Sequence, residues 1–416
     1  MTTKVYFCSM QENQTVKFEF IALMASLMSI VALAIDAILP AISTIGASIN
    51  SLDSTSNQLL ITMIFLGLGV GQLIIGPLSD SVGRKPMVYI GFVIFALASI
   101  ICVLSPSLEW MVFGRILQGI GLAAPRTIAI AIIRDLYKGD YMAKIMSFIT
   151  TFFILVPVVA PVMGKFILNH YNWKGIFYVQ LLIAFLVCIW FWKKQPETLK
   201  PEHQVKFNKH LFIDGFKELI KHKITLGFTI ISGFISGAFI VYLSASQVIF
   251  ENQYGLIEEF PFIFAGLAVG VGLSTFLNAT LVMHLGMWRL SFIAIITFSI
   301  NALLYVLIFW NSPNPSLPVL LVFMAIQFLT IGFIFGNIRA IAMEPIGHIA
   351  GIGASITGFV STIMAVPIAN YIGSFITTTA LPLFIGFSVF GILSVLIFVR
   401  MHAIPNKEDI LSEVLK

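Results

Sequence analysis

The chain has few charged residues. Asp, Glu, Lys and Arg make up 10% of its 416 residues, whereas hydrophobic residues make up 58%. Soluble domains carry roughly 25% charged residues, so a soluble fold of this length would lack the polar surface that it needs. The three cysteines, Cys8, Cys102 and Cys188, have neither metal-binding nor redox spacing. They therefore give no disulfide framework and favour a packing role.

Motifs of enzymes, channels and nucleotide-driven pumps are also missing. The sequence has no paired His and Asp, no serine elbow, no metal-ligand spacing and no Gly-x-x-x-x-Gly-Lys-Ser/Thr loop. It has no re-entrant filter or ring of charges typical of a channel. We therefore expect no enzyme activity, no catalytic residue, no cofactor, no metal and no use of ATP. The first twenty residues contain Glu12 and Glu19 and no small-residue cleavage site, so the first apolar run is expected to be a helix rather than a signal peptide.

Hydrophobic residues gather in long runs, each near the ~20 residues that a helix needs to cross the ~30 Å hydrocarbon core. Such unbroken runs favour helices, because the strands of a membrane barrel alternate polar and apolar residues. The sequence predicts an all-α integral membrane protein. Its twelve predicted transmembrane helices are 18–42, 58–78, 86–105, 110–132, 145–168, 174–192, 224–247, 261–283, 289–310, 318–341, 350–373 and 381–402.

Basic residues are distributed unevenly between the connecting segments. With both termini in the cytoplasm, 19 of the 24 Lys and Arg residues lie on the cytoplasmic side, and only Lys165 and Lys174 lie outside. Because cytoplasmic loops are enriched in Lys and Arg, this distribution predicts cytoplasmic termini and an even number of spans. The net charge of +5 follows from this topology and gives no reason to expect nucleic acid as a partner.

One long hydrophilic stretch divides the predicted spans into six and six. The sequence predicts an N-terminal half at 1–192, a cytoplasmic linker at 193–223 and a C-terminal half at 224–416. Apolar residues recur on one helical face of 211–220 with lysines beside them, which fits a short helix on the inner membrane surface; a solvated linker fits equally well. Gly83 and Gly286 close similar segments in the two halves and indicate a weak internal repeat.

Four motifs occur in order in the first half. The first predicted span carries Asp36 and Pro40, and the second ends in Gly76-Pro-Leu-Ser-Asp80-Ser-Val-Gly83-Arg84-Lys85. The fourth span carries Arg115-Ile-Leu-Gln118-Gly119-Ile-Gly121 and is followed by Arg134-Asp135, and the fifth carries Ala160-Pro161-Val-Met-Gly164. Together they resemble the major facilitator superfamily, in its twelve-span drug:proton antiporter branch close to the Bcr/CflA multidrug efflux group. The resemblance covers essentially the whole chain.

This resemblance implies the major facilitator fold and proton-coupled efflux of amphipathic small molecules or drugs by alternating access. It implies a monomer in the bacterial inner membrane, whose partners are a small-molecule substrate, protons and the lipid bilayer. The alternative is proton-coupled uptake or export of one specific metabolite or siderophore, because the same fold serves both.

The resemblance also implies a conformational latch formed by Gly76, Asp80, Gly83, Arg84 and Arg134. In the family, the acid corresponding to Asp80 meets the start of the eleventh helix, here near 350–353, and a basic residue, here Arg134. A carboxylate at a helix N-terminus is stabilised by ~0.3–1 kcal/mol. The expected contact holds the two halves together on the cytoplasmic side.

The fifth span carries the residues that the resemblance assigns to an antiporter helix, Pro157, Pro161 and Gly164. Each proline removes an N–H donor and bends the helix. Prolines and glycines are also common in transmembrane helices for packing alone.

Asp36 is the only acidic residue that lies clearly inside a predicted span. A carboxylate there costs ~2.5–3.5 kcal/mol, so it needs a partner or a function. The membrane interior disfavours its ionised form, which suits a group that loads and releases a proton. Arg115 lies at a similar depth from the outer side and is the predicted ion-pair partner. We expect Asp36 and Arg115 to form the proton-coupling site; a permanent structural pair is the alternative.

Three further polar residues lie inside the spans. Gln118 follows Arg115 by three residues and either binds substrate or bridges helices. Arg126 is expected to line the substrate cavity and favour anionic or acceptor-rich substrates, with a structural pairing as the alternative. Arg339, near the inner end of the tenth span, is expected to extend to the membrane interface.

Overall fold

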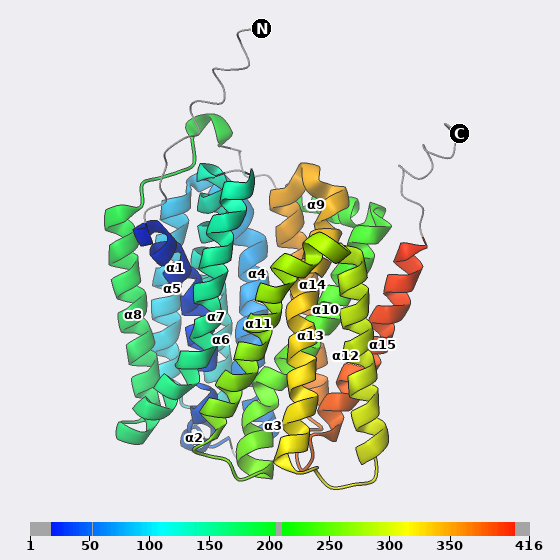
Figure 1. Cartoon of the computed structure of the whole chain (residues 1–416). Coiled ribbons are helices and arrows are strands. Elements are labelled where there is room, and N and C mark those ends of the chain that lie inside the picture. Colours follow the sequence, from blue (N-terminus) through cyan, green and yellow to red (C-terminus); the bar gives the residue numbers. More distant parts are fainter. Residues whose placement is uncertain (1–17, 52, 138, 205–209, 404–416) are drawn as a thin grey trace, which may run out of the picture.

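The computed structural model describes residues 18–51, 53–137, 139–204 and 210–403, which form a bundle of helices (Figure 1). The α-helices are α1 (Phe18–Asp36), α2 (Ile42–Ser48), α3 (Ser54–Asn57), α4 (Leu59–Val82), α5 (Arg84–Leu104), α6 (Leu108–Leu136), α7 (Gly139–His170), α8 (Trp173–Lys194), α9 (His210–Lys221), α10 (Lys223–Gln247), α11 (Phe260–Leu285), α12 (Met287–Phe309), α13 (Leu317–Met343), α14 (Ala350–Gly373) and α15 (Leu381–His402). The shorter segments are η1 (Leu39–Ala41), η2 (Pro201–His203), the π-helical η3 (Val248–Gln253) and η4 (Glu344–Ile349).

The outer surface of the bundle is apolar. On α5, large apolar residues recur every three or four positions and are 45–70% exposed: Ile90, Val93, Leu97, Ile100 and Leu104. Soluble proteins rarely expose such continuous apolar surface, so this stripe faces lipid. Within the described ranges, eleven helical segments are long and apolar enough to cross a membrane, and α7 contributes a shorter apolar helix, Leu155–His170.

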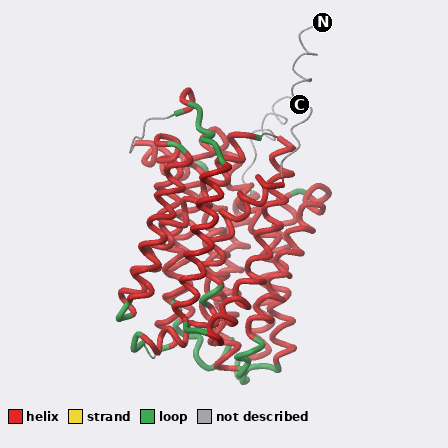
Figure 2. Tube along the Cα trace, turned by 90° about the vertical axis from the view of Figure 1, so that its left-hand side faces the viewer, coloured by secondary structure: helices red, strands yellow, loops and turns green. Residues whose placement is uncertain are grey.

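The described part of the chain begins and ends at the same end of the bundle. The start of α1 and the end of α15 lie at the top of Figure 1, whereas α2 and α3 lie at the bottom. In the perpendicular view, most loops gather at the two ends of the bundle with helices between them (Figure 2). A chain that starts and finishes at one end crosses the bundle an even number of times.

Helices from distant parts of the sequence meet along two seams, α4 against α14 and α7 against α11. Within the first part of the chain, α6 packs against both α4 and α5. A Cβ atom on Gly119 of α6 would overlap the Ile64 carbonyl oxygen of α4, and one on Gly121 would lie 2.6 Å from the Phe95 nitrogen of α5. Small residues allow membrane helices to approach closely, so the glycines of this motif serve packing.

Several helices extend beyond their predicted ends, and the extensions of α4 and α6 carry charged residues. α4 continues through Pro77 to Val82, and α6 continues to Leu136. Asp80 therefore lies on a helix, and the predicted charged turn is reduced to Gly83. The φ of Gly83 is 115°, which glycine adopts without steric cost. Gly286, its predicted counterpart, ends α11 with a φ of 76°.

The first predicted span is interrupted near its outer end. α1 ends at Asp36, and the chain continues through η1 into α2. Pro40 lies in η1 and has no N–H to donate to the Asp36 carbonyl. The last carbonyl groups of α1 are therefore open to side-chain donors.

The hydrophilic middle of the chain contains the helix α9, which packs against α14. The rings of Phe216 and Phe359 meet edge to face, 6.3 Å apart, and Leu219 is 3% exposed. A helix therefore forms in the predicted linker, but its apolar face contacts α14 rather than serving a membrane surface alone.

Candidate functional site

Asp36 lies in the last turn of α1, in the interior of the bundle. It is 5% exposed, and none of the described residues forms a hydrogen bond or ion pair with its carboxyl group. Across from it, α10 contacts η1 and carries Tyr242, which is 1% exposed. The Tyr242 hydroxyl also lacks a hydrogen-bond partner within the described ranges, and the charge of Asp36 acts on it. Two unsatisfied polar groups, a carboxyl and a phenol, therefore lie near each other on facing helices.

The predicted ion pair between Asp36 and Arg115 is absent. Arg115 is fully buried, and its guanidinium donates from Nε to the Leu60 carbonyl at 2.7 Å and from both Nη atoms to the Ala34 carbonyl at 3.1 Å. Because α1 stops at Asp36, the Ala34 carbonyl is one of its open C-terminal acceptors. Arg115 has the predicted depth, but it binds the backbone beside Asp36 rather than the carboxylate.

Gln118 connects Arg115 to α5. Its Oε1 accepts from Arg115 Nη1 at 2.7 Å, and its Nε2 donates to Ser99 Oγ at 2.7 Å. Gln118 is fully buried, and both ends of its amide are in use. Of the two roles predicted for Gln118, substrate binding and bridging helices, this geometry supports the bridge between helices.

α7 approaches the Asp36 segment through Gly164. A Cβ atom on Gly164 would overlap the carbonyl oxygen of Ala37, so only glycine permits this approach. Pro157 and Pro161 lie inside α7, about two turns and one turn before Gly164. The predicted antiporter helix is thus in backbone contact with the residue that follows Asp36.

Two arginines, Arg126 of α6 and Arg339 of α13, come close enough for their positive charges to repel each other. Arg126 is half-buried and Arg339 is exposed, although protein atoms surround both. Both side chains are therefore at least partly accessible to solvent. In the part of the chain that the structure describes, neither guanidinium has a hydrogen-bond or ion-pair partner. Arg339 is exposed, and its expected extension to the membrane interface stays a prediction.

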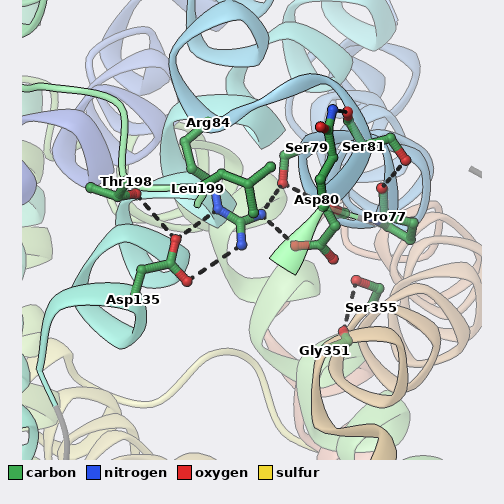
Figure 3. Close-up of polar contacts among 12 residues, drawn as sticks. Pro77, Ser79, Asp80, Ser81, Arg84, Asp135, Thr198, Leu199, Gly351 and Ser355 are labelled. Carbon is green, nitrogen blue, oxygen red and sulfur yellow. Dashed lines mark hydrogen bonds and ion pairs between the residues drawn. The ribbon is translucent and has the colours of Figure 1, made fainter. Parts of the chain in front are cut away.

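A charged cluster of Asp80, Arg84 and Asp135 joins α4, α5 and α6 (Figure 3). Arg84 pairs with Asp80 through Nη1 at 2.5 Å and with Asp135 through Nε at 2.9 Å. Its Nη1 also donates to Ser79 Oγ at 2.7 Å. Arg84 is 3% exposed, so these bonds satisfy a buried cation.

Glu197, just after α8, caps the start of α5. Its carboxylate accepts from the backbone N–H of Arg84 at 3.1 Å and of Lys85 at 2.9 Å, and from those of Thr198 and Leu199. Partial burial opposes ionisation of Glu197, but these N–H donors outweigh it and hold its pKa below the ordinary value of 4.5. A carboxylate at a helix N-terminus is also stabilised by the helix dipole.

The predicted latch residues divide into two groups. Gly76 touches α14, because a Cβ atom there would lie 2.7 Å from Ser355 Oγ, and Arg134 lies beside Gly351 at the start of α14. Asp80, however, pairs with Arg84 of its own region, and the described residues of α14 and Arg134 form no hydrogen bond or ion pair with it. The expected bond between Asp80 and the start of α14 is therefore not made in this structure.

The sequence analysis left out several residues of these sites. Asp135 was named in a motif without a role, and Glu197 was not considered. Glu251 lies in η3, just beyond the predicted end of its span, where Gln247 Nε2 donates to its Oε2 at 2.7 Å. The four-residue spacing from Gln247 is the signal that marks Glu251 as a continuation of the helix. No three His, Cys, Asp or Glu side chains in the described ranges gather as a metal site.

A bundle of lipid-facing helices with a broken helix and an unpaired interior carboxyl is typical of an integral membrane transporter. The family model of the Major Facilitator Superfamily matches residues 24–369, and the chain belongs to this family.

Two curated relatives refine this assignment. The chain is 30% identical over 355 residues to an uncharacterized MFS-type transporter of Bacillus subtilis, covering 84% of this chain and 87% of that protein. It is 27% identical over 404 residues to a bicyclomycin resistance protein homologue of Haemophilus influenzae, covering 93% and 96%. The latter confirms the predicted resemblance to the Bcr/CflA drug:proton antiporter group.

Among solved structures, a D-xylose-proton symporter is similar with a TM-score of 0.71 and 15% identity, covering 93% of this chain and 97% of that one. At this identity the similarity shows the fold alone.

Proposed function

We propose that this protein is a proton-coupled exporter of amphipathic small molecules that works by alternating access. The observation that carries the proposal is Asp36, a carboxyl group buried inside a membrane bundle without a partner among the described residues. A structural acid in this setting needs a permanent cation, because an isolated charge in the membrane is costly. An acid that is neutral when protonated and ionised when released to water fits proton transfer. The relationship to a bicyclomycin resistance homologue supports export.

The proposed architecture has twelve spans in two halves, 1–192 and 224–416, joined by the linker 193–223. The eleven apolar helices, the shorter segment Leu155–His170 and the position of both described ends on one side support it. The distribution of Lys and Arg supports cytoplasmic termini in a bacterial inner membrane. We take the monomer as the transporting unit.

The burial pattern fits a conformation closed to the outside. The last residues of α10 and the first of η3 are buried next to the segment that follows Asp36, from Ile240 to Phe250. In this state Asp80 binds Arg84, and we propose that it moves to the start of α14 and Arg134 when the protein opens outward.

Energised inside-out vesicles test the function directly. A panel of neutral, cationic and anionic amphipathic compounds is added to the medium one at a time, while the pH inside the vesicles is recorded. An exporter takes up several compounds and releases one or more protons in exchange for each. Uptake of a single metabolite, or accumulation without proton movement, would contradict the proposal.

A further inference from the structure

Gln180 lies in α8, which packs against α1. The side chain is fully buried, and its Nε2 donates to the carbonyl oxygen of Leu33 at 3.3 Å, in the last turn of α1. The same carbonyl oxygen also accepts from the N–H of Ala37 at 3.2 Å. Arg115 of α6 binds the neighbouring carbonyl group, that of Ala34. The broken end of α1 is therefore held by side chains from two different helices.

The amide group of Gln180 keeps hydrogen-bonding capacity after this contact. An amide nitrogen has two N–H donors, and the bond to Leu33 uses one of them. The Oε1 acceptor is buried and has no hydrogen-bond partner among the described residues. A buried acceptor without a hydrogen bond costs free energy, so it favours a partner that can supply a donor. A free N–H and a free oxygen on one amide match a protonated carboxyl group, which offers one O–H donor and one C=O acceptor.

Asp36 lies three residues after Leu33, and at this spacing a helical side chain reaches back toward the carbonyl group of the earlier residue. In another helix of the chain, the same spacing brings Ser79 Oγ to 2.8 Å from the carbonyl oxygen of Gly76. The carboxyl group of Asp36 and the amide group of Gln180 therefore both lie within reach of one carbonyl oxygen. They form no hydrogen bond with each other in this structure.

Other charged and titratable side chains lie on the helices around the end of α1. Arg115 of α6 is bound by carbonyl and amide oxygens, and Lys165 of α7 pairs with Glu258 at 3.1 Å. Tyr242 of α10 is buried, and its hydroxyl has no partner within the described ranges. Tyr242 is therefore the alternative partner for the carboxyl group, which a test has to separate from Gln180.

We propose that Gln180 is a positioning residue that binds the protonated carboxyl group of Asp36 through two hydrogen bonds. The O–H of Asp36 donates to Oε1 and its C=O accepts from the second N–H, while the first N–H stays on Leu33. The ionised carboxylate cannot form the bond to Oε1, because neither oxygen then carries a proton. Gln180 thereby distinguishes the proton-loaded carboxyl group from the ionised one. The inference rests on the proposed proton-coupling role of Asp36 and adds the group that recognises its protonated form.

Infrared difference spectroscopy between acid and alkaline buffer tests the pair on purified protein in lipid. The C=O stretching band of protonated Asp36 is identified by its loss in Asp36→Asn. Gln180→Leu should move this band to higher wavenumber, because the C=O stretch rises when its hydrogen bond is removed. If Gln180→Leu does not fold, Gln180→Met, with an unbranched side chain of similar length, carries the test.

Gln327→Leu is the matched control, because it makes the same substitution at another fully buried glutamine, on α13. This control and Tyr242→Phe should both leave the Asp36 band in place. A band that stays unmoved in the Gln180 variants, one that moves in Tyr242→Phe instead, or no Asp36 band in the wild type overturns the inference. The measurement needs neither substrate nor a proton gradient, so it is decided separately from the vesicle test of export.

Discussion

Arg115 donates two hydrogen bonds of 3.1 Å to the carbonyl oxygen of Ala34, two residues before the acid with which it was expected to pair. The interruption of α1 at Asp36 leaves this carbonyl without a helical donor. Arg115 thus anchors the broken end of α1 to α6, and the Asp36 carboxyl group has no hydrogen-bond partner among the described residues.

Arg115→Ala is expected to lower the free energy of unfolding by about 3 kcal/mol or more, because it leaves buried carbonyls and an amide oxygen unsatisfied. Thermal unfolding of the purified protein in detergent measures the loss. Arg400→Ala, at an exposed position near the end of α15, is the control and should change little. An Arg115→Ala protein as stable as the wild type would remove the anchoring role.

Gly164→Ala places a methyl group against the Ala37 carbonyl and should destabilise the protein by ~1–3 kcal/mol, as overpacking does. It should also slow transport, because α7 is pushed away from the Asp36 segment. The control is Gly270→Ala on α11, where a Cβ atom meets nothing within 4 Å and alanine is the better helix former. If Gly164→Ala and Gly270→Ala change stability and transport to the same extent, the close approach of α7 to Ala37 contributes to neither.

Glu197→Gln tests the cap of α5. The folded-state pKa of Glu197 lies below its ordinary value, so the carboxylate contributes stability above the unfolded-state pKa of ~4.3. This contribution is lost as the pH falls from that value through the lower folded-state pKa. The wild type should therefore lose its stability advantage over Glu197→Gln at acid pH, while Glu202→Gln at an exposed position shows no such change. A constant difference between wild type and Glu197→Gln from pH 7 to pH 3 is the contrary result.

Asp80→Asn should favour the conformation open to the cytoplasm, because a neutral amide interacts weakly with the start of α14 and with Arg134, whereas Arg84 keeps its ion pair with Asp135 in the present conformation. Spin labels on the cytoplasmic ends of α6 and α13 report the distance between them by pulsed electron resonance. We expect a larger share of long distances in Asp80→Asn than in the wild type. Asp214→Asn, on the exposed face of α9, is the control. Unchanged distance distributions would exclude a latch at Asp80.

The sequence predicts the spans well because run length and polarity depend on the membrane alone. Helix ends differ where charged residues pair: Arg84 forms ion pairs with Asp80 on α4 and Asp135 on α6, and both helices continue past their apolar runs. Depth along a helix follows from residue number. The direction of a side chain does not follow from residue number. The depth of Arg115 was therefore predictable, but its hydrogen-bond partners were not.

Residues whose role depends on distant backbone were not predictable. Glu197 caps a helix that begins 113 residues earlier in the chain, and no local pattern marks this contact. In the sequence, nothing distinguishes Tyr242 from the many other aromatic residues. Its position near Asp36 follows only from the contact between α10 and η1, the segment after α1. Glu251 depends on the π-helical turn that continues α10 beyond its apolar run.

The central claim is that Asp36 carries the proton. Asp36→Asn keeps the size of the side chain and fixes it as neutral, so it can bind substrate but cannot be recharged by a proton gradient. Asp214→Asn again provides the control, since it removes an exposed carboxylate from α9.

The decisive measurement is substrate accumulation driven by a pH gradient in proteoliposomes, alongside exchange of labelled substrate without a gradient. The account predicts that Asp36→Asn loses accumulation and retains exchange, whereas Asp214→Asn retains both. If Asp36→Asn concentrates substrate as the wild type does, another group carries the proton and the proposed coupling at Asp36 is wrong.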